Sequence, residues 1–151
     1  MGVVCKDGVI LGTEKIVSNK MMVSGTDKRI ANVTKSIGSV VNGLTPDGRA
    51  LMHRGREESA QYKEHFGIDI PGRVFSDRIA SFVQMHTIYS SYRPYGTSMI
   101  VAAHDIMKGA TLHMIEPSGA CYQYYGCASG RGKQLCRNEI EKAKFGEMSV
   151  E

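Results

Sequence analysis

The chain has 151 residues, of which 42% are hydrophobic and 23% are charged, and it carries a formal net charge of +4 at pH 7. This length suffices for one domain with a hydrophobic core, and the balance of residues excludes a disordered chain. No apolar run approaches the ~18 residues of a membrane-spanning helix, and the first residues lack the pattern of a secretory signal. The basic residues are scattered among acidic ones, so we expect neither a membrane nor a nucleic acid as partner.

The first third of the chain predicts β-structure. Apolar and polar residues alternate on both sides of Asp7-Gly8, a dipeptide that favours a tight hairpin turn. Three further strands are expected at residues 20–23, 29–33 and 37–41.

The middle of the chain changes to a helical period. A first apolar or small-residue stripe recurs every three or four residues, at Leu51, Gly55, Ser59, Tyr62 and Phe66. Asp47 is predicted to cap the start of this helix and Gly67 to end it. The small residues indicate close packing against a neighbouring element. A second stripe, from Phe75 to Tyr89, predicts another helix that ends before Pro94.

From Thr97 onward the period returns to two. Strands are expected at residues 97–105, 110–117 and 120–126, and a last helix begins near Gly132. The order of strands, two helices, strands and a helix predicts an α+β fold. In such a fold two sheets face each other and helices cover their outer faces.

The four cysteines and five histidines do not form a metal-binding pattern. The cysteines contain no CxxC pair, and the histidines contain no HxxxH or HxH pair. We therefore expect no metal and no cofactor, and we interpret the cysteines as reduced and mostly buried.

Three polar features have both a functional and a structural interpretation. The run SGRGKQ at residues 129–134 could hold an anion, but Cys127 and Gln134 break the phosphate-loop pattern, which favours a tight strand-to-helix turn. His86 lies in an apolar stripe, which favours a core or interface histidine over a base or ligand. The run RGREE at residues 54–58 is typical of a charged helix surface with local ion pairs.

Four stretches resemble, in order and spacing, the α-type subunits of the 20S proteasome. They are GVILGTEKIVSNKM at 8–21, NGLTPDGRALMHRGREESAQYKEHFG at 42–67, YSSYRPYGTSMIVA at 89–102 and MIEPSGACYQYYGCASGRGKQ at 114–134. The most specific pieces are RPYG, EPSG and the glycine turn before the last helix. The stretches DKRIANV and EIEKAKFGEMS are most similar to α subunits of type 3.

The resemblance implies the four-layer αββα sandwich of N-terminal-nucleophile hydrolases, as one domain over residues 1–151. It also implies a domain truncated at both ends. The gate-forming tail and first helix of the family have no counterpart here, and neither do its last helix, closing strands and acidic tail. We therefore expect an exposed sheet edge and low stability for the isolated chain.

The resemblance also implies that catalytic residues are absent. Catalytic β-type relatives use a threonine at the mature N-terminus, whose own amine acts as base. Aligned on Gly8, that threonine would precede Met1, and Cys5 lies inside a strand without a free amine. Glu14 takes the place of an assisting aspartate. Arg29 takes the place of an assisting lysine, and arginine cannot be deprotonated in a protein.

A binding role for Arg29 follows from the same family. In α rings, pockets between neighbouring subunits receive the C-terminal tails of activator complexes, and a lysine there pairs with the tail carboxylate. Arg29 occupies the place of that lysine, with Lys28 beside it, and a guanidinium can bind a carboxylate through two hydrogen bonds. The alternative is an ordinary ion pair.

The function implied by the resemblance is that of a non-catalytic structural subunit of the 20S proteasome, active in ATP- and ubiquitin-dependent protein degradation. Its partners would be other α subunits in a heptameric ring, β-ring subunits and activator particles, in the cytoplasm and nucleus. Two alternatives remain open. One is an N-terminal-nucleophile hydrolase whose nucleophile lies upstream of Met1, and the other is a basic RNA-binding module, for which the sequence has no base-stacking motif.

Overall fold

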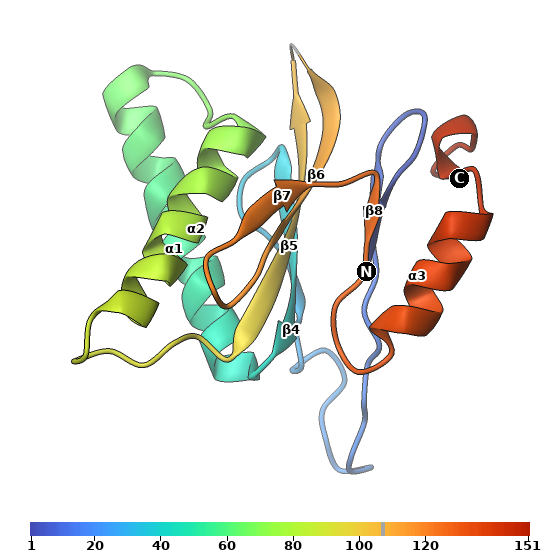
Figure 1. The fold of residues 1–151 in the computed structure, drawn as a ribbon, viewed down its shortest axis with the longest axis horizontal. Helices are drawn as coiled ribbons and strands as arrows, with labels where there is room; N and C mark the ends of the chain where they lie inside the picture. The colour runs from blue at the N-terminus through green and yellow to red at the C-terminus, as the bar shows by residue number, and fades with distance from the viewer. Residues whose placement is uncertain (107) are drawn as a thin grey trace.

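Two antiparallel sheets lie face to face in the structure, a computed structural model that describes residues 1–106 and 108–151. Two helices cover the outer face of the larger sheet, and a third helix covers the smaller sheet (Figure 1). The predicted α+β class and its αββα layers are confirmed.

The larger sheet has five strands in the order β3-β4-β5-β6-β7. The strands are β3 (Ile30–Asn32), β4 (Ile37–Gly43), β5 (Thr97–Asp105), β6 (Gly109–Ile115) and β7 (Cys121–Gln123). Every neighbouring pair is antiparallel. The ladder between β4 and β5 runs from Ile37 opposite Ala103 to Gly43 opposite Thr97, and the ladder between β5 and β6 is equally long. The strands expected at residues 29–33, 37–41, 97–105 and 110–117 are confirmed.

The smaller sheet has three strands in the order β2-β1-β8. These are β1 (Gly2–Val4), β2 (Val9–Leu11) and β8 (Gly126–Cys127). The predicted hairpin is confirmed, because Val4 lies opposite Val9 and the amide of Cys5 donates to the carbonyl of Gly8. Its two turn residues are Lys6 and Asp7, one position before the predicted Asp7-Gly8. Strand β2 is an edge strand, and a groove of about 370 Å³ runs beside it.

Two strand predictions are wrong. Residues 20–23 form turns in the long connection between β2 and β3, where the amide of Met22 donates to the carbonyl of Asn19. Their side chains are mostly exposed, with Met21 89% exposed. An extended conformation is therefore not stabilised here by packing against a neighbouring strand. The strand expected at residues 120–126 is two strands, because the chain leaves the larger sheet after Gln123 and enters the smaller one at Gly126.

The two helices of the larger sheet's outer layer are α1 (Thr45–Phe66) and α2 (Gly72–Ile88). The predicted end of α1 is confirmed, because Gly67 has a left-handed φ of 72° and its amide donates to the carbonyl of Lys63. The prediction that Asp47 caps α1 is wrong. Leu44 is the N-cap residue, and Asp47 lies in the first turn with a different set of partners.

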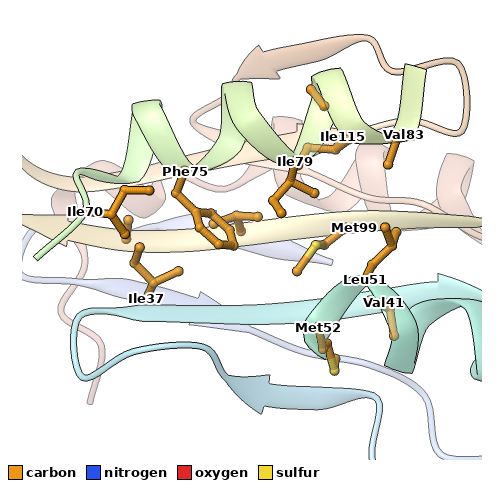
Figure 2. Packing of buried hydrophobic residues seen from close by; sticks show 13 residues of the cluster. Ile37, Val41, Leu51, Met52, Ile70, Phe75, Ile79, Val83, Met99 and Ile115 are labelled. Atoms are coloured by element: carbon orange, nitrogen blue, oxygen red, sulfur yellow. The ribbon is translucent and has the colours of Figure 1, made fainter. Parts of the chain in front are cut away.

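The main core fills the space between these helices and the larger sheet (Figure 2). Phe75 and Ile79 of α2 and Leu51 of α1 are almost completely buried there. Gly55 is one of the small residues of the α1 stripe, and the structure shows why it is small: a Cβ at this position would lie 2.9 Å from Cζ of Phe75. The two helices can therefore approach closely at this point, as the sequence predicts.

The last helix, α3 (Lys133–Lys142), packs on β8 and is followed by a short 3₁₀ helix, η1 (Phe145–Glu147). The predicted start near Gly132 is confirmed. A Cβ at Gly126 would lie 2.5 Å from Cγ2 of Ile140, so glycine on β8 allows α3 to lie directly against the strand.

Replacement of Phe75 by alanine is expected to lower the free energy of unfolding by about 3–5 kcal/mol, because it leaves a cavity under both helices. Phe66→Ala is the matched control: Phe66 is 60% exposed at the end of α1, and its loss is expected to cost about 1 kcal/mol or less. Chemical unfolding of the two variants measures the difference. Equal losses would contradict the assignment of the core.

Candidate functional site

The start of β1 carries an amine but no nucleophilic side chain. The α-amino group of Met1 donates to the carbonyl of Gly12 at 2.8 Å. Burial lowers the pKa of this amine below its usual range. A methionine side chain offers no hydroxyl or thiol that the amine could activate.

The other residues at or near catalytic positions of the β-type relatives are Cys5, Glu14 and Arg29, and they do not form a common site. Cys5 is buried at the end of β1, where its amide donates to the carbonyl of Gly8 at 2.8 Å. Glu14 is exposed in the connection between β2 and β3. Among the hydrogen bonds and ion pairs of residues 1–106 and 108–151, none joins Cys5, Glu14 and Arg29.

Arg29 lies directly before β3. Its backbone carbonyl takes part in the sheet, and its side chain lies near a carboxylate. Its carbonyl accepts a hydrogen bond from the amide of Val41 at 3.0 Å, which extends the β3–β4 ladder. Its Nε lies 3.8 Å from Oδ2 of Asp27, a loose ion pair, and has no hydrogen-bond partner within the described part of the chain. The Arg29 side chain is 24% exposed, and Lys28 beside it is exposed. The ordinary ion pair, which was the alternative to a binding role for Arg29, is therefore present. It leaves the Nε donor of the guanidinium without a hydrogen bond in the part of the chain that the structure describes.

Asp47 and Arg93 form a bidentate ion pair. Nη1 and Nη2 of Arg93 donate to the two oxygens of Asp47 at 2.8 and 2.7 Å, and the amide of Gly96 donates to Asp47 at 2.9 Å. The Arg93 guanidinium, with the Gly96 amide, lowers the pKa of the buried Asp47 carboxyl from 3.8 to about 2. This clamp ties the RPYG stretch to the first turn of α1.

The glycine-rich run before α3 is a tight turn, as the structural interpretation predicts. Gly130 has a left-handed φ of 110°, and the amide of Lys133 donates to its carbonyl at 3.2 Å. The run borders a cavity of about 360 Å³, where the hydroxyls of Ser98 and Ser129 lie 2.5 Å apart. Lys133 and Arg137 of α3 line the same cavity.

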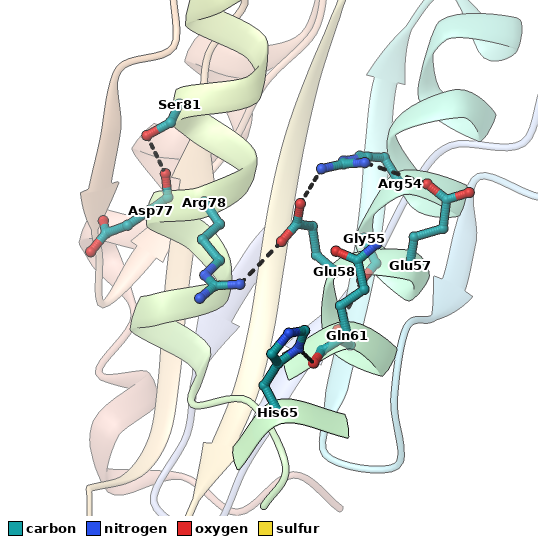
Figure 3. Close-up of polar contacts among 10 residues, drawn as sticks. Arg54, Gly55, Glu57, Glu58, Gln61, His65, Asp77, Arg78 and Ser81 are labelled. Carbon is teal, nitrogen blue, oxygen red and sulfur yellow. Dashed lines mark hydrogen bonds and ion pairs between the residues drawn. The ribbon is translucent and has the colours of Figure 1, made fainter. Parts of the chain in front are cut away.

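The charged run at residues 54–58 forms local ion pairs, as predicted, and also joins the two outer helices (Figure 3). Glu58 accepts from Arg54 of the same helix and, at 3.3 Å, from Arg78 of α2. His86 is half-buried: its Nδ1 lies 2.9 Å from the carbonyl of Phe82, and its ring packs against aromatic neighbours. The interpretation of His86 as a packed histidine is confirmed.

Neither a metal site nor a membrane span emerges from the described residues. No group of three potential ligands among His, Cys, Asp and Glu is close enough there to hold a metal ion. No helix in this part of the chain combines the length and the apolar character needed to cross a bilayer.

Two facing antiparallel sheets between helical layers, with an N-terminal hairpin in the smaller sheet, define the class of the αββα sandwich of N-terminal-nucleophile type. A profile of the family described as "Proteasome subunit" matches residues 1–151. The chain therefore belongs to the proteasome subunit family.

Curated relatives agree with this family and with the predicted likeness to type 3. The chain is 44% identical to proteasome subunit alpha type-3 of Acanthamoeba castellanii over 99% of this chain and 59% of the relative. It is 44% identical to proteasome subunit alpha type-3 of Dictyostelium discoideum over 95% of this chain and 58% of the relative. It is also 44% identical to probable proteasome subunit alpha type-7 of Saccharomyces cerevisiae over 94% of this chain and 49% of the relative. The chain thus spans between 49% and 59% of the length of these relatives.

Sequence reasoning missed the partnership of Asp47 with Arg93. Both residues lie in stretches that the resemblance marks as specific, but they are 46 positions apart. An aspartate just after a proline at the start of a helix has the same appearance as a helix cap, so only the fold distinguishes the two roles.

Replacement of Asp47 by asparagine is expected to lower the unfolding midpoint at neutral pH. A carboxyl with a depressed pKa contributes stability above its unfolded pKa and loses it as the pH falls through the folded value. The gap between wild type and Asp47→Asn should therefore narrow as the pH falls from about 3.8 to about 2. Chemical unfolding of both proteins across this pH range measures the difference in stability.

Asp69→Asn provides the control, since Asp69 forms an exposed ion pair with Lys63. That variant should unfold close to wild type at every pH. A gap between wild type and Asp47→Asn that stays constant down to pH about 2 would contradict the clamp.

Proposed function

We propose that this chain is a non-catalytic structural subunit of the α ring of the 20S proteasome. The observation that carries the proposal is the match of all 151 residues to the proteasome subunit family together with α-type relatives at 44% identity. The partners would be other α subunits in a heptameric ring, subunits of the β ring and activator particles. The process is ATP- and ubiquitin-dependent protein degradation, in the cytoplasm and nucleus.

The chemistry of the N-terminal edge supports a structural rather than a catalytic role. Threonine-type catalysis requires a nucleophilic oxygen on the residue whose amine acts as base. Aligned on Gly8, the place of that residue precedes Met1, and the nearest nucleophilic side chain, Cys5, is buried next to β1. Arg29, at the place of the assisting lysine, keeps its proton at all physiological pH values and so cannot take part in proton transfer.

Docking of an activator tail at Arg29 and Lys28 is a second part of the proposal. A carboxylate-terminated tail needs donors that are within reach and not fully paired. Nε of Arg29 is buried, but the 24% exposed guanidinium has only a loose 3.8 Å contact with Asp27, and the exposed Lys28 adds positive charge beside it.

Purification of the tagged chain from cells that express it, with identification of every co-purifying protein, tests the structural role. We expect other α-type and β-type proteasome subunits in the purified material. A threonine-directed covalent inhibitor should label the β-type subunits and leave this chain unlabelled. Labelling of this chain at a residue upstream of Met1 would overturn the proposal in favour of the hydrolase alternative, and purification of the chain alone would overturn the ring assignment.

Arg29→Ala should weaken activator docking at one pocket of the assembled particle while assembly stays intact. Lys20→Ala is the matched control, because Lys20 is an exposed cation in the same connection and has no proposed contact with a tail. Binding of the activator to the two purified particles measures the effect. Equal binding would show that the pocket does not use Arg29.

A further inference from the structure

His113 is buried at the junction of α2 and the larger sheet. It lies on β6, opposite Val101 of β5 and Gln123 of β7, and only 4% of its surface is exposed. Its strand neighbours Leu112 and Met114 enter the core between the two sheets, so the imidazole lies on the opposite face, beneath α2. Its Nδ1 has no hydrogen-bond partner in the described part of the chain.

Ser76 of α2 lies over the same point of the sheet. Near the start of β6, a Cβ at Gly72 would lie 3.3 Å from Oγ1 of Thr111. Beyond the end of β6, the backbone of α2 lies close to Gly119. Helix α2 therefore runs along β6. One helical turn rises by about 6 Å, and two strand residues advance by about the same distance. Ser76, one turn after Gly72, therefore stands above His113, two residues after Thr111. Its hydroxyl is completely buried and also has no partner among the residues described.

Among the described residues, no carboxylate lies within ion-pair distance of the His113 ring. Arg73 and Asp77 of α2 are exposed and pair with each other at 3.8 Å. Asp105, at the end of β5, accepts from the first amide of α2 at 3.1 Å. Burial raises the pKa of the Cys121 thiol on β7 to about 11, so that group is neutral. Burial also lowers the pKa of His113, and the distant carboxylates of Asp77 and Asp105 only partly oppose it.

We propose that His113 is a proton-sensitive contact that holds α2 on the larger sheet. The neutral imidazole fits the space beneath α2, whereas an imidazolium there would carry two N–H donors into a site with no carboxylate in contact. Protonation therefore loosens α2 from the sheet. Because α1 and α2 form one outer layer, acid weakens that whole layer, with or without partner chains.

The sign of the effect follows from proton linkage. The unfolded chain binds the proton of His113 more readily than the folded chain does. Stability is therefore complete above the ordinary histidine pKa of about 6.5 and decreases as the pH falls through it. For each unit by which the folded pKa lies below the unfolded one, the unfolding constant rises about tenfold.

Chemical unfolding of the full 151-residue chain at neutral pH and at about pH 5 tests the contact. The wild-type midpoint should fall in acid, and His113→Gln, which cannot be protonated, should lose most of that fall. His104→Gln is the matched control, since His104 is exposed on the neighbouring strand and should keep the full wild-type fall. An undiminished acid fall in His113→Gln would overturn the proposal.

A second measurement on the wild-type chain decides the matter if His113→Gln does not fold. NMR titration of the imidazole should give a pKa below about 6.5, and amide exchange in α2, corrected for its intrinsic pH dependence, should accelerate as His113 is protonated. A titration at or above that value, or α2 protection that is unchanged across it, would overturn the proposal.

Discussion

The five-stranded sheet is buried on both faces, and the rest of the structure depends on this constraint. On one face Val41 and Val101 enter the core beneath α1 and α2, whereas on the other Val40 and Ile100 enter the core between the sheets. Exposure of either face to water would leave a large apolar surface in contact with solvent. The sheet therefore requires an outer helical layer on one side and a second sheet on the other, which gives the four layers. The Asp47–Arg93 clamp then fixes the connection by which the chain passes from the helical layer back into β5.

Much of this architecture is predictable because it depends on local periodicity. The stripes of the two outer helices reflect burial of one face of each helix, the glycine that ends the first helix reflects its left-handed backbone, and the apolar runs of β5 and β6 reflect burial on both faces of the sheet. The wrong predictions concern features that a local pattern does not contain. Residues 20–23 have the composition of a strand but no neighbouring strand, and residues 120–126 look continuous although the chain changes sheets within them.

The candidate site was less accessible to pattern reasoning than the fold. Nothing in the local sequence distinguishes Arg29 from any other basic residue near a strand, and its interest came from the resemblance to α-type subunits. Asp47 is a strong local helix-cap candidate whose actual partners come from a segment far along the chain. The burial of Ser76 and His113 without hydrogen-bond partners likewise follows from the packing of α2 on the larger sheet, so neither sequence neighbourhood marks it.

The role proposed for this chain is that of a subunit that keeps the shape of the N-terminal-nucleophile sandwich, with Arg29 at the place of the assisting lysine and the place of the threonine, aligned on Gly8, before Met1. On that proposal the chain acts as a rigid block within a larger assembly. The mass of the native particle that contains this chain, measured by native mass spectrometry, tests that account most directly. The account predicts a mass many times that of one 151-residue chain, consistent with a complete ring or stacked rings. A mass equal to one or two copies of the chain would contradict it.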